Sequence, residues 1–247
     1  MDPPGIPHTI DVSGPRSGGH AARMPTPRWI LLPLLAACRA QDPVPPPPTP
    51  SLEGAVLGID VSSHQGVIDW GDVAGDGVRF TFVKATEGKT FTDPRFAANW
   101  AGARRAGLKV GAYHYFSACR TGAEQARHFL AVVPPGQATL PAVVDVEPDH
   151  RCNRGRRWSM VADEVATWLD AVELATGQRP LLYASDSVHQ TDLAGLEAER
   201  WVASYSRAPR VATWGVWQHT ERGQVEGIDG PVDRNLATEA WWSAHRL

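Results

Sequence analysis

The chain has 247 residues, of which 43% are hydrophobic, and a formal net charge of −3. This is enough sequence for one sizeable domain, and an α/β barrel alone can use most of it. The weak negative charge and the lack of a basic run argue against a nucleic-acid-binding protein. The nine histidines are scattered without zinc-ligand spacing, so we expect neither a metal site nor a cofactor.

An apolar run at residues 29–37 follows the short stretch Met24–Arg28 and precedes Cys38. This pattern is typical of a secretory signal, and the run is too short to span a bilayer, which needs about 20 apolar residues. The letters before and at Cys38, Leu-Ala-Ala-Cys, resemble the lipobox of bacterial lipoproteins. The resemblance implies lipid attachment at Cys38. Residues 1–37 are then a signal peptide behind an over-extended gene start, with Met24 as the true start. The alternative is an ordinary cleaved signal with an incidental Cys38.

Residues 38–53 are rich in proline and are expected to form an extended tether of up to ~45 Å rather than a packed segment. The folded domain is therefore predicted at residues 54–247. We expect an exported protein, either anchored to a membrane through Cys38 or secreted. Arg39, which follows the anchor cysteine, favours the outer membrane because the inner-membrane retention signal has an aspartate there.

Short apolar segments alternate with helical patterns along the first two thirds of this domain. The predicted helices start at Asp93, with Asp93 as N-cap and Pro94 in the first turn, at Thr121 and at Ser159, and they end at Gly107, Val133 and Ala175. The predicted strands are residues 56–62, 79–87, 109–116, 141–148, 181–185, 201–205, 214–219 and 227–233. This order predicts a mostly parallel sheet, closed as a barrel whose later helices are reduced or missing. In such barrels the reacting groups lie at the C-terminal ends of the strands.

The strand at 141–148 places Asp145 and Glu147 on one face, roughly 6–7 Å apart along the backbone. Burial of two acids is costly unless they are paired or partly protonated. The alternative is that these acids bind an arginine or cap the next helix. The other predicted strand ends also carry acids and aromatic or amide side chains, namely Asp60, Glu87, Tyr113, Tyr115, Tyr183, Tyr205, Gln218 and Asp233. A purely structural barrel has no reason to gather so many like charges at one mouth.

Three smaller predictions concern residues near that mouth. Lys84 and Glu87 are expected to form a structural ion pair. His64 and His114 either contact a sugar or serve as hydrogen-bonded structural histidines. Cys119 and Cys152 each follow a predicted strand end, and a disulfide between them would stabilise an exported domain by about 3–4 kcal/mol. Two unpaired thiols are the alternative.

Six motifs together resemble the family 25 glycoside hydrolases, the Chalaropsis-type N-acetylmuramidases, from about Val56 to Asn235. They are Gly58-Ile-Asp-Val-Ser-Ser-His-Gln-Gly66, Lys84-Ala-Thr-Glu-Gly88, Gly111-Ala-Tyr-His-Tyr-Phe116, Asp145-Val-Glu147, Trp217-Gln218 and Gly227-Ile-Asp-Gly-Pro-Val-Asp233. The resemblance implies an irregular, flattened TIM-like (β/α)5(β)3 barrel in the α/β class. It also implies hydrolysis of the β-1,4 bond between N-acetylmuramic acid and N-acetylglucosamine in peptidoglycan glycan strands.

The resemblance further implies that Glu147 is the catalytic acid, with Asp145, Asp60 and Asp233 as companion acids. Crowding and partial burial should keep Glu147 protonated, whereas Asp145 is expected to stay ionised and to orient the acetamido group or stabilise the oxocarbenium ion. Tyr113, Tyr183 and Trp217 are candidate sugar-stacking faces, each also compatible with core packing, and Gln218 is a candidate substrate contact. We expect a monomer. The rival hypotheses are a glycan-binding module without turnover and a metal-dependent hydrolase using His64, His114, Asp145 and Asp233.

Overall fold

The computed structural model describes residues 51–133, 135–148, 152 and 158–245. The predicted signal peptide, Cys38 and nearly all of the proline-rich tether lie outside these residues. Among the described helices, none combines the length and the apolar character that crossing a membrane requires.

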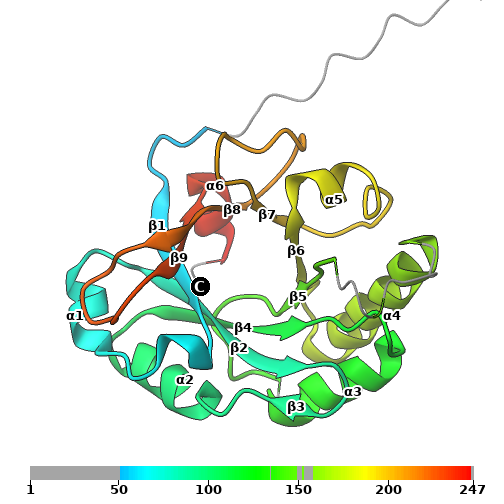
Figure 1. Ribbon diagram of the computed structural model, residues 1–247, viewed down its shortest axis with the longest axis horizontal. Coiled ribbons are helices and arrows are strands. Elements are labelled where there is room, and N and C mark those ends of the chain that lie inside the picture. Colours follow the sequence, from blue (N-terminus) through cyan, green and yellow to red (C-terminus); the bar gives the residue numbers. More distant parts are fainter. Residues whose placement is uncertain (1–50, 134, 149–151, 153–157, 246–247) are drawn as a thin grey trace, which may run out of the picture. The chain divides into compact units, whose positions relative to one another are not determined.

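Eight strands form a closed barrel (Figure 1). The pairing order is β1-β9-β8-β7-β6-β5-β4-β2, and β1 closes the ring by pairing with β2 as well as with β9. All pairs are parallel except those of β9, which runs antiparallel to both β1 and β8. The strands are β1 (Val56–Val61), β2 (Phe80–Glu87), β4 (Lys109–Tyr115), β5 (Val143–Asp145), β6 (Leu181–Ser185), β7 (Arg200–Ala203), β8 (Val216–Gly223) and β9 (Val232–Ala237). A short strand, β3 (Phe91–Thr92), adds to the edge of β2.

The helices follow the first five barrel strands, which confirms the predicted (β/α)5(β)3 order. They are α1 (Trp70–Gly75), α2 (Phe96–Arg105), α3 (Gly122–Val132), α4 (Trp158–Thr176) and the short α5 (Asp186–Gln190), while η1 (Ser63–Gln65) is a single 3-10 turn after β1. No described helix lies between β7, β8 and β9, so this side of the ring has little helical cover (Figure 1). A final helix, α6 (Glu239–His245), was not predicted from the sequence.

Several predicted boundaries were wrong for local reasons. Asp93 does not cap α2, which begins at Phe96; its carboxylate instead accepts hydrogen bonds from the Arg95 and Ser63 backbone amides at 2.8 and 2.9 Å. Ser159 lies inside α4 rather than capping it, since the helix already includes Trp158.

The predicted last strand at residues 227–233 is mostly a turn. Gly227 and Gly230 have φ angles of 85° and 92°, which a strand does not permit, so β9 starts only at Val232. Because β9 is antiparallel to β1, Asp233 near its start still lies opposite Asp60 near the end of β1. The predicted position of Asp233 at the mouth therefore holds although the strand was misplaced.

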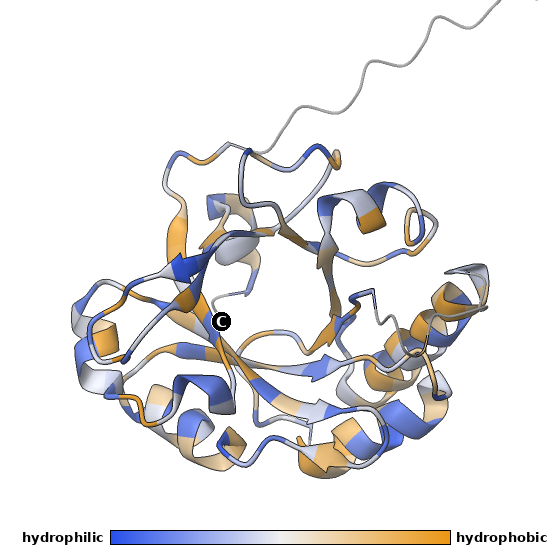
Figure 2. Ribbon diagram, in the orientation of Figure 1, coloured by the Kyte–Doolittle hydropathy of each residue, from blue (hydrophilic) through white to orange (hydrophobic). Residues whose placement is uncertain are grey.

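Side chains alternate along the strands between the barrel interior and the helix layer. The interior cluster includes Phe80 and Phe82 of β2 with Trp201 of β7, and the Phe82 and Trp201 rings stack at 4.7 Å. The outer cluster joins the opposite face of the strands to the helices, as Val83 of β2 illustrates. Most barrel strands are therefore apolar on both faces, and hydrophilic residues are concentrated in stretches such as the outer part of β8 (Figure 2).

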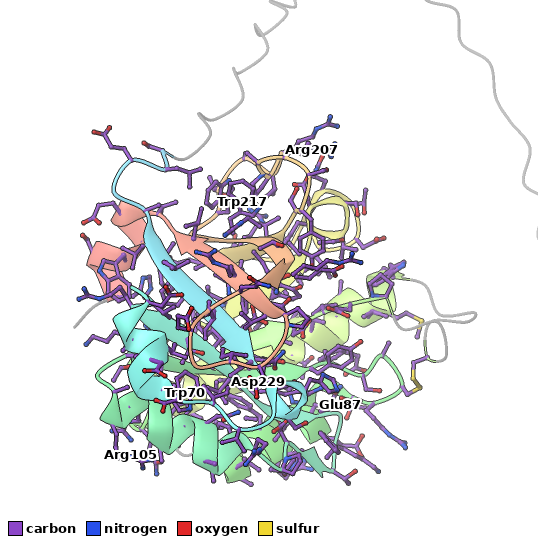
Figure 3. All side chains as sticks on the ribbon, turned by 60° about the vertical axis from the view of Figure 1, so that its left-hand side comes forward. Trp70, Glu87, Arg105, Arg207, Trp217 and Asp229 are labelled. Carbon is purple, nitrogen blue, oxygen red and sulfur yellow. A yellow bond between two sulfur atoms is a disulfide. The ribbon has the colours of Figure 1, made fainter. Side chains whose placement is uncertain are left out.

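The predicted disulfide between Cys119 and Cys152 is present, with the two Cα atoms 4.9 Å apart (Figure 3). It joins the connection after β4 to the connection after β5. The prediction rested on neighbouring strands having neighbouring loops, and β4 and β5 do pair directly.

Candidate active site

A cavity of about 270 Å³ opens at the C-terminal ends of the parallel strands, above the aromatic interior of the barrel. All four predicted acids line it, although they come from β1, from β5 and the residues after it, and from β9. Its lining residues are Asp60, Ser62, His64, Lys84, Tyr113, Tyr115, Asp145, Glu147, Tyr183, Trp201, Gln218 and Asp233. The cavity thus brings together polar groups that are far apart in the sequence.

Asp60 is the most strongly hydrogen-bonded of the four acids. Its Oδ2 atom accepts from Gln218 Nε2 at 2.9 Å and from Asn235 Nδ2 at 2.8 Å. Both amide side chains are buried, and both sit on strands that are one and two places from β1 in the barrel. Asp60 is therefore held in one orientation by the barrel itself.

Asp233 faces Asp60 across the antiparallel β1–β9 ladder. Burial and the neighbouring Asp233 charge raise the pKa of Asp60 well above its usual value. Burial, followed by the charges of Glu221 and Glu147, raises the pKa of Asp233 to about 6. The two carboxyls therefore retain a proton at pH values where free aspartates are ionised.

Asp145 and Glu147 lie across the barrel from this pair, at the end of β5. Burial raises the pKa of both carboxyls, and each negative neighbour, first of all Glu147, raises that of Asp145 further. Asp145 Oδ1 is buried and has no hydrogen-bond partner among the residues that the structure describes. The structure thus opposes the expectation that Asp145 stays ionised, because no described group of the chain donates a hydrogen bond to Oδ1.

Glu147 has two stabilising neighbours. The Tyr115 hydroxyl donates to Glu147 Oε2 at 3.4 Å, and this contact together with the Lys84 charge offsets part of the pKa increase that burial causes. Lys84 also forms the predicted ion pair with Glu87, at 2.8 Å, and its ammonium group lies 4.8 Å from the centre of the Tyr115 ring. Lys84 and Tyr115 thus line the Glu147 side of the cavity and contact each other there.

The two histidines have different environments. His114 is fully buried between the sheet and helices α3 and α4, where its ring nitrogens contact Thr86 Oγ1 at 2.7 Å and Gln125 Oε1 at 3.2 Å, and burial lowers its pKa to about 3. It is the structural histidine that one reading of the sequence predicted. His64 instead lines the cavity. His114 of the metal-dependent rival does not line the cavity, and within the described residues no group of three or more His, Cys, Asp or Glu side chains is arranged so that it could hold a metal ion.

Of the two alternatives for Trp217, sugar stacking and core packing, its surroundings favour packing, because Trp217 does not line this cavity. Its indole N–H donates to the Ser204 carbonyl at 2.8 Å, and its ring packs against Trp214 outside the barrel interior. In Figure 3 Trp217 and Arg207 lie in the upper part of the view and Glu87 in the lower part. The reason is strand alternation: Gln218 points into the cavity, so its neighbour Trp217 points outward. The other predicted contacts, Tyr113, Tyr183 and Gln218, do line the cavity.

Sequence reasoning missed Ser62 and Trp201 as cavity residues and Asn235 as a partner of Asp60. The period of two along a strand would have found two of them, since Ser62 follows Asp60 and Asn235 follows Asp233 at that spacing. Trp201 carried no such signal, because its role depends on a contact with Asn235 of β9, two strands away in the barrel.

Comparison with known proteins agrees with this geometry. The profile of the family described as "Glycosyl hydrolases family 25" matches residues 59–228. The chain is 45% identical over 192 residues to the uncharacterized protein YegX of Escherichia coli K12, covering 73% of this chain and 69% of that one. It is 33% identical over 204 residues to lysozyme M1 of Streptomyces globisporus, covering 75% and 69% of the two chains.

Solved structures give the same result. The crystal structure of the bacterial lysozyme from Streptomyces coelicolor superposes with a TM-score of 0.71 at 30% identity, covering 77% of this chain and 97% of that one. A family 25 glycosyl hydrolase from Bacillus anthracis gives a TM-score of 0.71 at 31% identity, with 78% and 94% coverage. The profile match covers most of the chain, and it includes the strands that carry three of the four acids. The chain therefore belongs to family 25 of the glycosyl hydrolases.

Proposed function

We propose that this chain hydrolyses the β-1,4 bond between N-acetylmuramic acid and N-acetylglucosamine in peptidoglycan, with Glu147 as the proton donor. The observation that carries the proposal is the meeting of Asp60, Asp145, Glu147 and Asp233 in one cavity. Glycoside hydrolysis requires a protonated carboxyl beside the leaving oxygen and negative charge near the developing oxocarbenium ion. The similarity to lysozyme M1 supports the choice of substrate.

Glu147 suits the role of acid because burial raises its pKa while it still lies at the open end of the cavity. The Tyr115 hydroxyl and the Lys84 ammonium fix the carboxyl without making it permanently anionic. In the first step the Glu147 proton passes to the glycosidic oxygen as the bond from that oxygen to the anomeric carbon breaks. In the second step Glu147 takes a proton from the water that completes the hydrolysis.

Asp145 is proposed to hold the acetamido group of the sugar. Its Oδ1 atom is buried without a donor from the described residues, and a buried acceptor of this kind is costly unless a ligand satisfies it. The N–H of an acetamido group would supply the missing hydrogen bond and favour the ionised form of Asp145. The acetamido oxygen is then directed at the anomeric carbon, to which it bonds as the leaving oxygen departs.

Asp60 and Asp233 are proposed to bind sugar hydroxyls and to keep negative charge on the opposite side of the ring. Tyr113 and Tyr183 present aromatic rings to the same cavity, and Gln218 joins Tyr183 to Asp60 through hydrogen bonds of 2.9 Å on each side. These residues form a wall of fixed donors and acceptors, which is the usual construction of a sugar site.

The substitution Glu147→Gln tests the assignment. It should lower the rate of muropeptide release from purified peptidoglycan by about 10²–10⁴-fold, because the isosteric amide cannot transfer a proton. Circular dichroism and the melting temperature should remain those of the parent. Glu173→Gln, which changes a carboxylate paired with Arg179 on the outside of the barrel, is the matched control and should retain full activity. Parental activity in the Glu147 variant would overturn the proposal.

We also propose that the enzyme is exported and tethered to a membrane by a lipid on Cys38, through the proline-rich residues 39–53. The described chain enters the barrel at β1, whose first residues lie at the end opposite the cavity. Metabolic labelling with palmitate and mass spectrometry of the mature N-terminus test this, and an unmodified N-terminus downstream of Cys38 would reject it.

A further inference from the structure

Two amide side chains converge on a single oxygen of Asp60. Gln218 Nε2 and Asn235 Nδ2 both donate to Oδ2, at 2.9 and 2.8 Å. Gln218 is 3% exposed and Asn235 is fully buried, so water does not compete for these bonds. The Oδ1 atom receives no amide from either residue.

The Asn235 amide cannot turn over. Its Oδ1 atom accepts a hydrogen bond of 2.8 Å from Trp201 Nε1, and an indole N–H is a donor only. Turning the amide would set two donors against each other at Trp201 and two acceptors against each other at Asp60. Trp201 therefore determines which end of Asn235 faces Asp60.

The Gln218 amide is fixed in a similar way. Its Oε1 atom accepts from the Tyr183 hydroxyl at 2.9 Å and from the Tyr205 hydroxyl at 2.8 Å. The Gln218 and Asn235 amides thus both donate N–H groups to Asp60 Oδ2, so that oxygen cannot also carry a proton. Any proton that Asp60 carries must lie on Oδ1.

Asp233 is the group that shares such a proton. It lies directly opposite Asp60 on the neighbouring antiparallel strand and lines the same cavity, and two carboxyls in this position repel each other less when they share one proton. The pair then carries one negative charge rather than two. The orientation of the Asp60 carboxyl in this pair is set by the Gln218 and Asn235 amides, and the Asn235 amide is in turn fixed by Trp201.

We propose that Trp201 and Asn235 are positioning residues of this enzyme, which confine the shared proton to the Asp60–Asp233 contact and so set the pH range over which the pair keeps a single negative charge. The inference deepens the proposed function, on which its activity measurement rests. Trp201 and Asn235 do not transfer protons; they act through Asp60.

Other charged and titratable groups also face this pair. They are Asp145 and Glu147 from β5 and the residues after it, Glu221 from β8, and the hydroxyls of Tyr113, Tyr183 and Tyr205. Lys84 of β2 acts on Asp145 and Glu147. Of these groups, Tyr183 contacts Trp201 directly, with ring centres 4.6 Å apart, and Trp201→Phe keeps an aromatic ring in that contact while removing the N–H that holds Asn235.

Trp201→Phe is the first test, because it removes the N–H and keeps an aromatic ring against Phe82. Freed from Trp201, Asn235 can present its oxygen to Asp60 Oδ2, which favours a proton there and strengthens proton binding by the pair. The acid limb of the kcat/KM profile on soluble glycan should move up by about 0.5–1 pH unit, with KM changed less than about twofold. A profile that superposes on that of the parent would overturn the proposal.

Trp241→Phe is the matched control. Trp241 also donates its indole N–H to a side-chain oxygen, Glu199 Oε2 at 2.8 Å, but it lies outside the cavity and belongs to α6. Its pH profile should be that of the parent. A shift as large as that of Trp201→Phe would show that the effect is a general consequence of losing a buried indole bond, and would also overturn the proposal.

Tyr205→Phe keeps the proposal testable if Trp201→Phe does not fold. Tyr205 is 50% exposed, so this change should leave the fold intact while removing one of the two hydroxyls that fix Gln218. The acid limb should move in the same direction by a smaller amount, because Tyr183 still holds Gln218 Oε1. No movement of the limb in this variant would count against the proposal.

A measurement without turnover separates this inference from the assignment of Glu147. Carbon-13 NMR of the aspartate carboxyls in a Glu147→Gln background should show Asp60 and Asp233 titrating as a coupled pair, and Trp201→Phe should raise the lower midpoint, at which the pair loses its single negative charge as the pH falls. If Glu147→Gln stays active but the midpoint moves, the proposed function fails and the positioning role stands. If Glu147→Gln is inactive and the midpoint does not move, the reverse holds.

Discussion

The two acid pairs of the cavity are built in opposite ways. Asp60 and Asp233 lie on adjacent antiparallel strands, and Asp60 is surrounded by amide donors that the barrel interior holds in place. Asp145 and Glu147 lie at the end of β5, where Asp145 Oδ1 has no partner among the described residues and Glu147 has one long contact to Tyr115. Asp60 and Asp233 are called the satisfied pair, because the protein supplies hydrogen-bond donors to Asp60. Asp145 and Glu147 are called the open pair, because Asp145 Oδ1 receives no donor from the described residues.

This difference indicates where the protein is prepared for a ligand. A satisfied carboxyl is held rigidly and contributes a fixed charge, whereas an unsatisfied one is destabilising until substrate supplies the missing hydrogen bond. Stability is commonly given up in this way at functional sites. We therefore expect substitutions in the open pair to affect catalysis most and substitutions in the satisfied pair to affect stability and pH dependence.

After Glu147→Gln, the largest effect is expected for Asp145→Asn. The amide cannot provide the negative acceptor that the acetamido N–H requires, so kcat should fall by about 10²–10³-fold with a smaller change in KM. Steady-state kinetics on purified peptidoglycan fragments measures both. Asp170→Asn, on the outer surface of α4 beside Arg179, is the control. Equal effects on kcat from Asp145→Asn and from a Gln218 substitution would remove the distinction between the pairs.

Removal of the disulfide should have the next largest effect. The open pair has few hydrogen bonds, but the Cys119–Cys152 bond ties the connection that follows Glu147 to the one that follows β4. The double change Cys119→Ser and Cys152→Ser should lower the free energy of unfolding by about 3 kcal/mol. Thermal unfolding of the oxidised parent, the reduced parent and the variant measures this. An unchanged melting temperature in all three would show that the bond does not stabilise this side of the barrel.

Asp233→Asn should stabilise the protein by a smaller amount. The pKa of Asp233 is raised to about 6, above its value of about 3.9 in an unfolded chain, so the folded state binds more protons between these limits. The free energy of unfolding therefore decreases as the pH rises from about 4 to 6. The variant cannot ionise at this position, so it should be more stable than the parent at pH 7. Partial exposure screens the charge, which limits the gain to about 1 kcal/mol. Denaturant unfolding at pH 4 and pH 7 would detect it; the same pH dependence in parent and variant would contradict it.

The smallest effect is expected for Trp217→Phe. Its indole N–H bonds the Ser204 carbonyl outside the barrel interior, so activity should stay within about twofold of the parent. A fall in kcat comparable to that of Asp145→Asn would mean that the cavity extends to the outer face of β8.

Much of this site could be predicted from the sequence because strand ends and acids coincide. Asp60 and Asp145 each lie at the end of an apolar segment, and parallel strands bring such residues to one end of a barrel. The direction of β9 could not be predicted, because it depends on a turn set by Gly227 and Gly230. The choice between the two alternatives for Trp217 could not be made, because a tryptophan beside a glutamine gives no indication of which of the two faces inward.

The hydrogen bonds that distinguish the two acid pairs also could not be predicted from the sequence. Trp201 and Asn235 are separated by 34 residues, and Asn235 and Asp60 by 175. Contacts of this range appear only when the whole ring has closed, and no local pattern encodes them. The disulfide was predictable because its two loops follow strands that are consecutive in the barrel.

The ring closes between β1 and β9, the first and the last barrel strands along the chain. The partners of Asp60 come from the last two barrel strands in the sequence. Gln218 lies on β8, and Asp233 and Asn235 lie on β9. A growing or truncated polypeptide without them has an incomplete acid cluster and an unsealed sheet. A fragment that ends before β8 lacks Gln218 and Asp233 and therefore cannot form the complete cavity.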